Sequence, residues 1–271
     1  MPKKTSCARS GDISLHVEQA GTGEPLLLIS GLGYSSWCWA ELREQLATQF
    51  NVITFDNRGT GQSDQPAGPY SMAMLADDAA QVLESCGVAR AQVIGHSMGG
   101  YIALTLALRH PDRVRSLTLI GTSPGGPDTQ AVPAETQSAW QAAAALPPEL
   151  YARTTMPRSF SLGWTAKNPQ RFEQILRRRV EFPTPMACWL AQYQACADYV
   201  TQGVDVSRIQ APALVIHGKE DRVVPYHNGE LLSARLPKAR FITLEGAGHL
   251  PYLEDPAGFA SLIREHLELH I

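Results

Sequence analysis

The segment of residues 91–109 constrains the fold of this chain more than any other. Residues 91–95 are apolar and end in glycine, which predicts a short buried β-strand, and residues 100–109 have the apolar spacing of a helix. Between them, residues 95–99 read Gly-His-Ser-Met-Gly, which predicts a sharp turn with Ser97 at its tip. Glycine at both ends of this turn lets the strand and the helix approach so closely that side chains there would collide. The segment therefore predicts a strand–turn–helix unit built around one serine.

The turn also predicts chemistry for its serine. A turn this sharp holds Ser97 at sparsely populated backbone angles and lifts its hydroxyl clear of the sheet. The Met98 backbone N–H, at the start of the helix, then points to the place where an oxyanion could form. The alternative is an ordinary glycine-rich connection, but the strand before it, the helix after it and the additional Gly100 favour a nucleophile.

Charge and cysteine content exclude several classes of partner. The 271 residues have a formal net charge of −3, and basic residues cluster only at 3–4 and 177–179, so no broad basic face for a nucleic acid is expected. We expect arginines 177–179 on the solvated side of a helix, although one of them could meet an anionic substrate. The five cysteines are scattered, odd in number and without a C-x-x-C pair, which predicts free thiols in a reducing compartment and no metal site.

Targeting signals are not evident in this sequence. Residues 1–12 lack the apolar core of a secretory signal, and no apolar run reaches the length of a membrane span. We therefore expect a cytoplasmic protein without a membrane partner.

Strands alternate with helices on both sides of the central turn, a pattern typical of an α/β fold with a mostly parallel sheet between helices. Strands are predicted at 25–29, 51–55, 114–120, 213–217 and 240–244 after an antiparallel edge hairpin at 5–18, and helices at 40–50, 71–87, 228–235 and from Asp255-Pro256 onward. The alternation stops at residues 124–206, where helical stretches carry many aromatic side chains. We interpret 124–206 as a helical cap (lid) inserted into a core made of 1–123 and 207–271, with some aromatics facing Ser97 around an apolar pocket.

A serine hydroxyl needs a base to take its proton, and in such a sheet the reactive loops follow the carboxyl ends of strands. His249 meets this requirement, because it lies in the loop directly after the last predicted strand. We expect the His96 side chain to point away from the hydroxyl. His217, at a strand end, is a candidate for a buried hydrogen-bonding residue. For His266 and His270, on the terminal helix, a solvated surface position is expected.

An acid must hold the imidazole in the right tautomer. Asp221 follows the penultimate strand and is the candidate, with Glu220 as a rival that a slip of one residue would exchange for it. Asp198 and Asp205, in or near the helical block, are weaker candidates. The chain order serine, acid, histidine is the one expected of this architecture.

Four motifs in order carry a resemblance to a known family. They are GHSMGG around Ser97, DNRGTGQSD from Asp56, HGKEDRVVP from His217 and EGAGHLPYLE from Glu245. Together they resemble the α/β-hydrolase superfamily over essentially the whole chain, and the sequence is most similar to small carboxylesterases and enol-lactone hydrolases. The resemblance implies the α/β-hydrolase fold and a catalytic triad of serine, acid and histidine.

The resemblance also implies a second oxyanion N–H, from Leu32, beside that of Met98. The chain departs from the family pattern at Ser30, where histidine is usual before Gly31. The donor is a backbone group, so we expect the oxyanion hole to persist with different hydrogen bonds in its loop. For Arg58 and Asp64 the resemblance favours a structural role, a loop that braces the turn, over a catalytic one.

These expectations combine into a functional prediction. The chain should hydrolyse a carboxylic ester or lactone of a small, largely apolar substrate through an acyl-serine intermediate, with Ser97, Asp221 and His249 as triad and no cofactor. Alternatives with the same triad are a C–C bond hydrolase or a perhydrolase or haloperoxidase-like enzyme; an acyltransferase and a non-catalytic ligand receptor are weaker ones. The sequence leaves monomer and homodimer open, together with the natural substrate.

Overall fold

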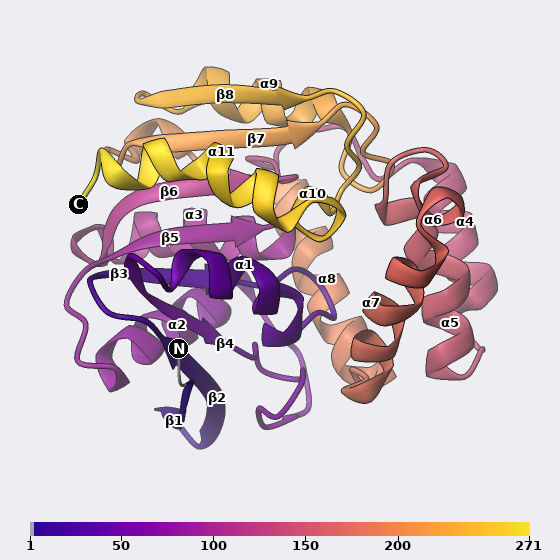
Figure 1. The fold of residues 1–271 in the computed structure, drawn as a ribbon, viewed down its shortest axis with the longest axis horizontal. Helices are drawn as coiled ribbons and strands as arrows, with labels where there is room; N and C mark the ends of the chain where they lie inside the picture. Colours follow the sequence, from indigo (N-terminus) through magenta and orange to yellow (C-terminus); the bar gives the residue numbers. More distant parts are fainter. Residues whose placement is uncertain (1–2) are drawn as a thin grey trace.

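The computed structural model describes residues 3–271 and contains one eight-stranded sheet with the order β1-β2-β4-β3-β5-β6-β7-β8 (Figure 1). The strands are β1 (Lys4–Ser10), β2 (Ile13–Ala20), β3 (Glu24–Ile29), β4 (Phe50–Phe55), β5 (Ala91–His96), β6 (Val114–Ile120), β7 (Ala213–Gly218) and β8 (Ala239–Leu244). β1 pairs antiparallel with β2, β2 pairs antiparallel with β4, and the other neighbours are parallel. The predicted mostly parallel sheet with an antiparallel hairpin at its edge is confirmed.

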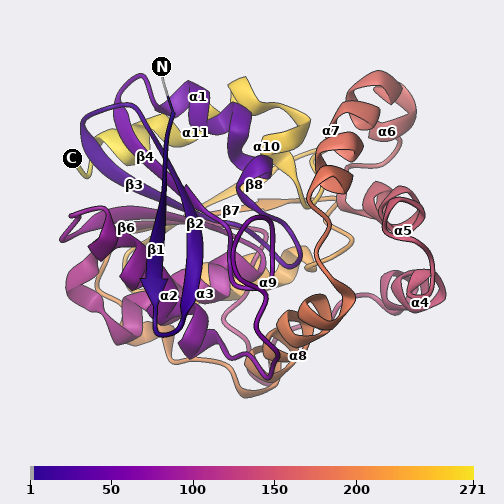
Figure 2. The same ribbon diagram turned by 90° about the horizontal axis from the view of Figure 1, so that it is seen from below.

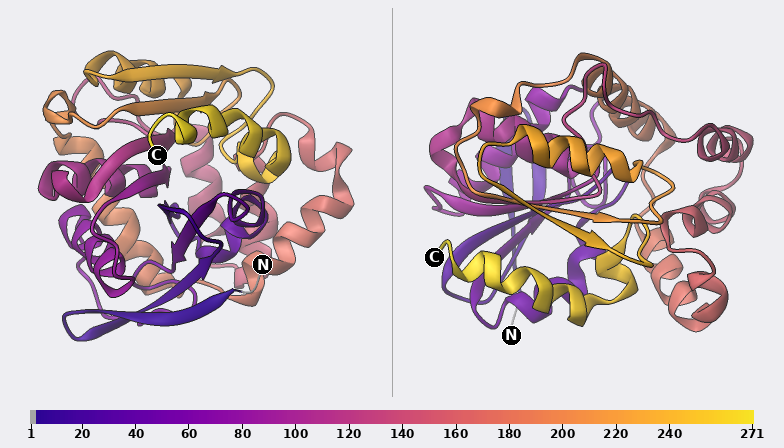
Figure 3. Two further views of the ribbon diagram at one scale, coloured as in Figure 1. Left: turned by 60° about the vertical axis from the view of Figure 1, so that its left-hand side comes forward. Right: turned by 90° about the horizontal axis from the view of Figure 1, so that it is seen from above.

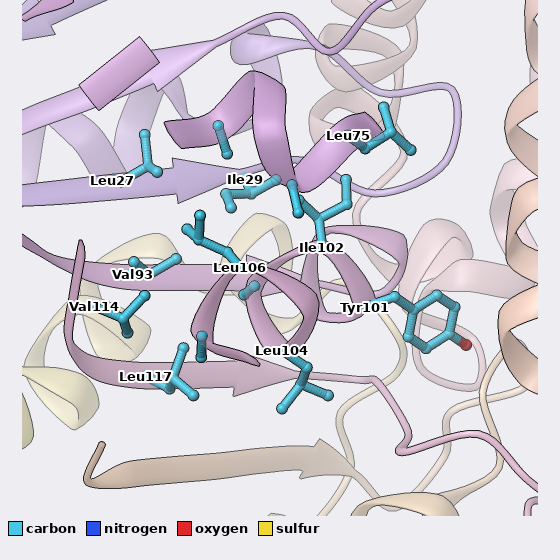
Figure 4. Packing of buried hydrophobic residues seen from close by; sticks show 14 of the residues in the cluster. Leu27, Ile29, Leu75, Val93, Tyr101, Ile102, Leu104, Leu106, Val114 and Leu117 are labelled. Atoms are coloured by element: carbon cyan, nitrogen blue, oxygen red, sulfur yellow. The ribbon is translucent and has the colours of Figure 1, made fainter. Parts of the chain in front are cut away.

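Helices cover both faces of the sheet, as Figure 2 shows from below. α2 (Met72–Ser85), α3 (Met98–Arg109) and α9 (Tyr226–Arg235) lie on one face, and α1 (Ala40–Leu46) and α11 (Pro256–Glu268) lie on the other. Because both faces are covered, the central strands are largely apolar, and all six residues of β5 are buried, including the polar Gln92 and His96. Figure 4 shows Ile102 of α3 beside Ile29 of β3 and Leu106 of α3 beside Val93 of β5, all within one buried cluster.

Helix ends follow the signals in the sequence, with one exception. The Ser71 side chain caps α2 by accepting a hydrogen bond from the Met74 N–H, and the Asp255 side chain caps α11 in the same way. The helix predicted over 40–50 ends at Leu46, however, because Phe50 is buried as the first residue of β4. Leu46 and Phe50 are four residues apart, as on one helix face, so the sequence pattern does not separate the helix from the strand that follows it.

The edge strand β2 carries a buried carboxylate. Glu18 contacts the side chains of Lys3, His16 and Arg43. Burial by itself raises the pKa of Glu18, but hydrogen bonds from His16 and Lys3 and the charge of Arg43 outweigh it and lower the pKa to about 2. Glu18 is therefore a charged group of the native state at neutral pH.

The terminal helix α11 corrects the expectation for one histidine. His266 is 3% exposed, not on the solvated surface, and its Nε2 lies 3.1 Å from the Leu117 carbonyl oxygen of β6. Burial, and then the neighbouring His270, lower the pKa of His266 to about 4, so the ring is neutral and donates this hydrogen bond. The face of α11 that packs on the sheet includes position 266, which its place near the chain end did not suggest.

Between β6 and β7 the regular elements that the structure describes are helical. They are α4 (Ala134–Ala143), α5 (Pro148–Thr155), α6 (Trp164–Lys167), α7 (Pro169–Glu181) and α8 (Met186–Gln202), with short 3-10 turns. Figures 1 and 3 show α4 to α7 beyond the end of the sheet toward which β5 to β8 point. α8 returns to the sheet layers, where Tyr199 stacks on Tyr101 of α3 with ring centroids 4.4 Å apart. No helix within residues 3–271 is both long and apolar enough to cross a membrane.

Candidate active site

The turn between β5 and α3 has the strained geometry that its sequence predicts. Ser97 has φ 53° and is the one non-glycine residue with positive φ in residues 3–271. A Cβ atom on Gly95 would lie 2.4 Å from the Gly99 carbonyl oxygen, and a Cβ atom on Gly99 would lie 2.1 Å from the Ile29 carbonyl oxygen. Both positions therefore exclude side chains. The Ser97 N–H donates to the Ile120 carbonyl oxygen at 2.9 Å, which fixes the turn to β6.

An imidazole and a carboxylate from two later loops meet near this turn. His249 Nδ1 lies 2.7 Å from Asp221 Oδ2, and both residues are buried. The other oxygen, Asp221 Oδ1, accepts the backbone N–H groups of Val223 and Val224, each at 2.8 Å. Burial by itself raises the pKa of Asp221, but His249 and His217 outweigh it, so the pKa lies below its ordinary value. Asp221 is ionised and receives the Nδ1 proton of His249 as a hydrogen bond.

The structure separates Asp221 from its rivals. The Glu220 carboxylate turns toward the helical segment of residues 124–206 and accepts the Leu162 N–H at 2.6 Å. Asp198 accepts a hydrogen bond from Gln194, and Asp205 caps a short 3-10 turn. Among these acidic side chains, the one within hydrogen-bond distance of His249 is Asp221.

Two further histidines pack around the pair. His217 is fully buried, and its Nε2 lies 2.9 Å from the Val224 carbonyl oxygen and 3.3 Å from Asp221 Oδ2. His96 turns its Nε2 to the His249 carbonyl oxygen at 2.9 Å and its Nδ1 to the Tyr252 hydroxyl at 3.2 Å. Burial first, and the neighbouring His249 second, lower the pKa of His96, so a neutral ring donates to one partner and accepts from the other. His96 thus holds the backbone of His249 and His217 holds the loop of Asp221, and the buried hydrogen-bonding role expected of His217 is confirmed.

Ser97 and His249 line the same cavity, which has a volume of about 280 Å³. No hydrogen bond joins the Ser97 hydroxyl to the His249 ring among residues 3–271. A catalytic hydrogen bond of this kind commonly tightens only when substrate binds. The structure thus brings the serine and the histidine to one cavity and forms the contact between histidine and acid.

The two expected oxyanion donors come from two loops, Leu32 from the loop after β3 and Met98 from the turn itself. The backbone N–H groups of Leu32 and Met98 donate to no acceptor in residues 3–271, and Leu32 lines the cavity. The loop that carries Leu32 is fixed from α8, where the fully buried Gln192 accepts the Gly33 N–H at 2.9 Å and donates to the Arg58 carbonyl oxygen at 3.0 Å. Sequence reasoning missed Gln192, whose only signal is an uncharged polar residue within the aromatic-rich helical block.

Ser30, the departure from the family pattern, has its own hydrogen bonds. Its carbonyl oxygen accepts from Asn57 Nδ2 at 3.1 Å, and its hydroxyl lies 3.5 Å from Cys38 Sγ. The loop that holds Asn57 is braced in turn, because Arg58 forms a two-pronged ion pair with Asp78 at 2.6 and 2.7 Å. The structural role expected of Arg58 is consistent with this pairing.

The cavity wall is aromatic on the side of the helical segment. Four of the aromatic residues expected in that block line the cavity, namely Trp140, Tyr151, Trp189 and Tyr193. Phe160 and Trp164 instead stack on each other, with ring centroids 4.6 Å apart. No group of three or more His, Cys, Asp or Glu side chains that could hold a metal ion gathers in the part of the chain that the structure describes.

The arginine cluster 177–179 is only in part on the solvated side of its helix. Arg177 and Arg178 are exposed, but Arg179 turns inward and lines the cavity. Its guanidinium lies over the Tyr34 ring, 4.9 Å from the ring centroid. Arg177 and Arg178 lie on the solvated side as expected, whereas Arg179 is partly exposed and faces the cavity, because successive helix residues point in different directions. Contact of one arginine of this cluster with an anionic substrate stays an open expectation.

Comparison with known proteins relates this geometry to a family. The family model described as "alpha/beta hydrolase fold" matches residues 24–256. A relative named "Putative carbamate hydrolase RutD", from Azorhizobium caulinodans, is 31% identical over 243 residues, which cover 89% of this chain and 90% of the relative.

Solved structures agree with the sequence comparison. A thermophilic esterase from Thermogutta terrifontis has a TM-score of 0.83 and 27% identity, with 100% of both chains covered. The enol-lactonase from Burkholderia xenovorans LB400 has a TM-score of 0.84 and 25% identity, with 97% of this chain and 100% of the other covered. The strained turn at Ser97, the mostly parallel sheet and these matches show that the chain belongs to the α/β-hydrolase fold family and is a hydrolase of that superfamily.

Proposed function

We propose that this hydrolase cleaves a carboxylic ester or a lactone through an acyl-serine intermediate, with Ser97, His249 and Asp221 as its catalytic triad. One observation carries the proposal. The strained serine lines the same cavity as a histidine whose other ring nitrogen is bound at 2.7 Å to a buried carboxylate. A nucleophile, a base and an orienting acid are the groups that acyl transfer requires.

In the first half of the reaction, His249 takes the hydroxyl proton as Ser97 attacks the substrate carbonyl carbon. The oxyanion that forms accepts the Leu32 and Met98 N–H groups, which have no other partner. One such donor is worth roughly 3 kcal/mol of the activation barrier. The tetrahedral intermediate then collapses, His249 protonates the departing alcohol or enol oxygen, and the acyl group stays on Ser97.

In the second half, His249 removes a proton from water, which attacks the acyl-serine, and the acid product leaves with Ser97 reprotonated. Asp221 stays ionised throughout, since its pKa lies below the ordinary range, and it stabilises the imidazolium that forms twice. The chemistry uses only side chains and backbone groups of this chain.

The substrate class follows from the cavity. A volume of about 280 Å³ with Trp140, Trp189 and Tyr193 in its wall fits a small molecule with a sizeable apolar part. We assign residues 124–206 as the cap that supplies this wall, from α4, α5, α7 and α8. The esterase and enol-lactonase among the similar structures support an ester or lactone.

Carbamate hydrolysis is a second candidate, supported by the name of the relative at 31% identity. An unsubstituted carbamate would occupy little of the aromatic cavity, so the wall favours the larger esters and lactones.

The test is a substrate panel of short p-nitrophenyl esters, γ- and δ-lactones, a p-nitrophenyl carbamate and a 1,3-diketone. The wild type should turn over an ester or a lactone fastest, and Ser97→Ala or His249→Ala should each lower kcat roughly 10⁶-fold. Ester turnover that survives Ser97→Ala would overturn the proposed nucleophile. Cleavage of the carbamate or the diketone alone would replace the proposed reaction, and labelling of Ser97 by a fluorophosphonate without any turnover would do the same.

A further inference from the structure

One charged side chain in the catalytic cavity has no partner. Arg179 of α7 donates no hydrogen bond to, and forms no ion pair with, any residue of 3–271. Arg153 pairs with Glu173 and Arg171 pairs with Glu41, whereas Arg177 and Arg178, which also have no such partner among these residues, are exposed. Within the described residues the contact of Arg179 is with the Tyr34 ring, so its N–H groups are left to water or to a ligand.

The guanidinium faces the same cavity as the proposed reacting groups. Arg179 lines the cavity together with Ser97 and His249, and a Cβ atom on Gly33 would be 3.1 Å from its Nη2 atom. Gly33 directly follows Leu32, one of the proposed oxyanion donors. The cation is thus beside the loop that faces the reacting carbonyl group.

No negative charge of the protein balances this cation within the cavity. The described residues that line it include no Asp, Glu or Lys, so Arg179 is the one permanently charged side chain in the wall. Its immediate neighbours are the rings of Tyr34 and Trp189. Burial lowers the pKa of Arg179, with Tyr34, Tyr151 and Cys38 partly opposing the shift. Arg179 keeps part of its surface exposed, and the cavity wall offers its charge no anionic partner.

We propose that Arg179 binds a carboxylate on the substrate, so that the preferred substrates are small esters or lactones that carry an acid group apart from the reacting carbonyl. The guanidinium presents a planar fork of N–H donors that matches both oxygens of a carboxylate. The aromatic wall then contacts the apolar chain between the two ends. This inference rests on the proposed function and narrows its substrate class.

The alternative is that Arg179 serves packing alone, through the face of Tyr34. A cation over an aromatic ring is stabilising whether or not the substrate is charged. If Arg179 serves packing alone, its replacement should lower kcat/KM equally for neutral and anionic substrates. If it binds a carboxylate, the replacement should lower kcat/KM mainly for the anionic substrate.

Matched pairs of esters separate these cases. The mono-p-nitrophenyl esters of succinic, glutaric and adipic acid are compared with p-nitrophenyl butanoate, pentanoate and hexanoate, in which a methyl group replaces the free carboxylate. For at least one chain length, Arg179→Met should lower kcat/KM for the half-ester about 10- to 100-fold and change that for the neutral ester less than threefold. Arg178→Met, on the exposed side of the same helix, is the matched control and should leave the ratio unchanged.

A binding measurement tests the carboxylate site independently of the proposed reaction. Monomethyl succinate, glutarate and adipate are titrated by calorimetry into Ser97→Ala and into Ser97→Ala/Arg179→Met, with thermal unfolding as the check that both are folded. At least one half-ester should bind about tenfold more tightly when Arg179 is present. Such binding without turnover by the wild type would overturn the proposed reaction alone. Turnover and binding that are equally insensitive to Arg179 at all three chain lengths would overturn the carboxylate site alone.

Discussion

Replacement of Asp221 by asparagine tests the acid of the triad with almost no change in shape. Oδ1 of Asp221 accepts two backbone N–H groups, those of Val223 and Val224, at 2.8 Å each. The amide NH₂ group of an asparagine cannot face these two donors, so its oxygen must take this place. The NH₂ group then faces His249 Nδ1, which in the native protein donates to Oδ2 at 2.7 Å.

The consequence is a reversed histidine tautomer. Nδ1 must accept from the asparagine, so the ring proton moves to Nε2, the nitrogen that would take the proton of Ser97. The same exchange in a serine protease lowers turnover about 10⁴-fold with the geometry intact. We expect Asp221→Asn to lower kcat by about 10⁴, which corresponds to roughly 5.5 kcal/mol in the activation barrier.

The assay is steady-state hydrolysis of the best ester in the panel at pH 7, with thermal unfolding to verify the fold. Glu220→Gln is the matched control, because this carboxylate binds Leu162 N–H instead of His249, and it should retain kcat within tenfold. Retention of a tenth or more of the activity by Asp221→Asn, with a large loss in Glu220→Gln, would refute the reasoning and move the acid by one residue.

Three further substitutions test the framework of the site. Arg58→Met should destabilise the protein by about 3–5 kcal/mol in urea unfolding, because it leaves a buried carboxylate unpaired, while kcat per folded molecule stays within tenfold; a large loss of kcat alone would contradict a structural role. Gly99→Ala should abolish soluble expression or cost more than about 3 kcal/mol, whereas Gly87→Ala, with positive φ but open space, should cost about 1 kcal/mol; equal costs would exclude the predicted clash with β3. Glu18→Gln should cost on the order of 2–3 kcal/mol at pH 7. Because the pKa of Glu18 falls from 4.5 to about 2 on folding, this stabilisation is present above pH 4.5, and the difference between wild type and variant should vanish as the pH falls toward 2; a difference independent of pH would assign it to packing.

Much of the fold could be predicted because its signals are local. The buried strands are short apolar runs, and Ser71 and Asp255 mark helix starts by side-chain caps that the structure contains. The turn around Ser97 was predictable for a steric reason, since a Cβ atom at position 99 would lie 2.1 Å from the Ile29 carbonyl oxygen and glycine has none. Where one apolar spacing served a helix and the next strand, at Leu46 and Phe50, the sequence placed the boundary too late.

The loops that form the candidate site could be predicted, but which of their residues face the site and which helix residues are buried could not. The choice between Asp221 and Glu220 needed coordinates, since adjacent residues in a loop point to opposite sides. His266 was expected in solvent because histidines near a chain end are usually exposed, and only the packing of α11 buries it. Which arginine of 177–179 faces the cavity likewise needed the packing of α7. Gln192 had no local signal, because both of its partners come from segments more than 130 positions earlier in the chain.

Besides shaping the cavity, the helical segment holds the loop of the proposed oxyanion donor through the side-chain amide of Gln192. One amide group holds the Gly33 N–H and the Arg58 carbonyl oxygen, so α8 and the loop before Tyr34 are mechanically joined. A displacement of α8 must either carry this loop along or leave two buried backbone groups without partners. Chimeras that import the helices of another hydrolase to alter selectivity would therefore disturb the reaction centre itself unless they keep an amide side chain at position 192.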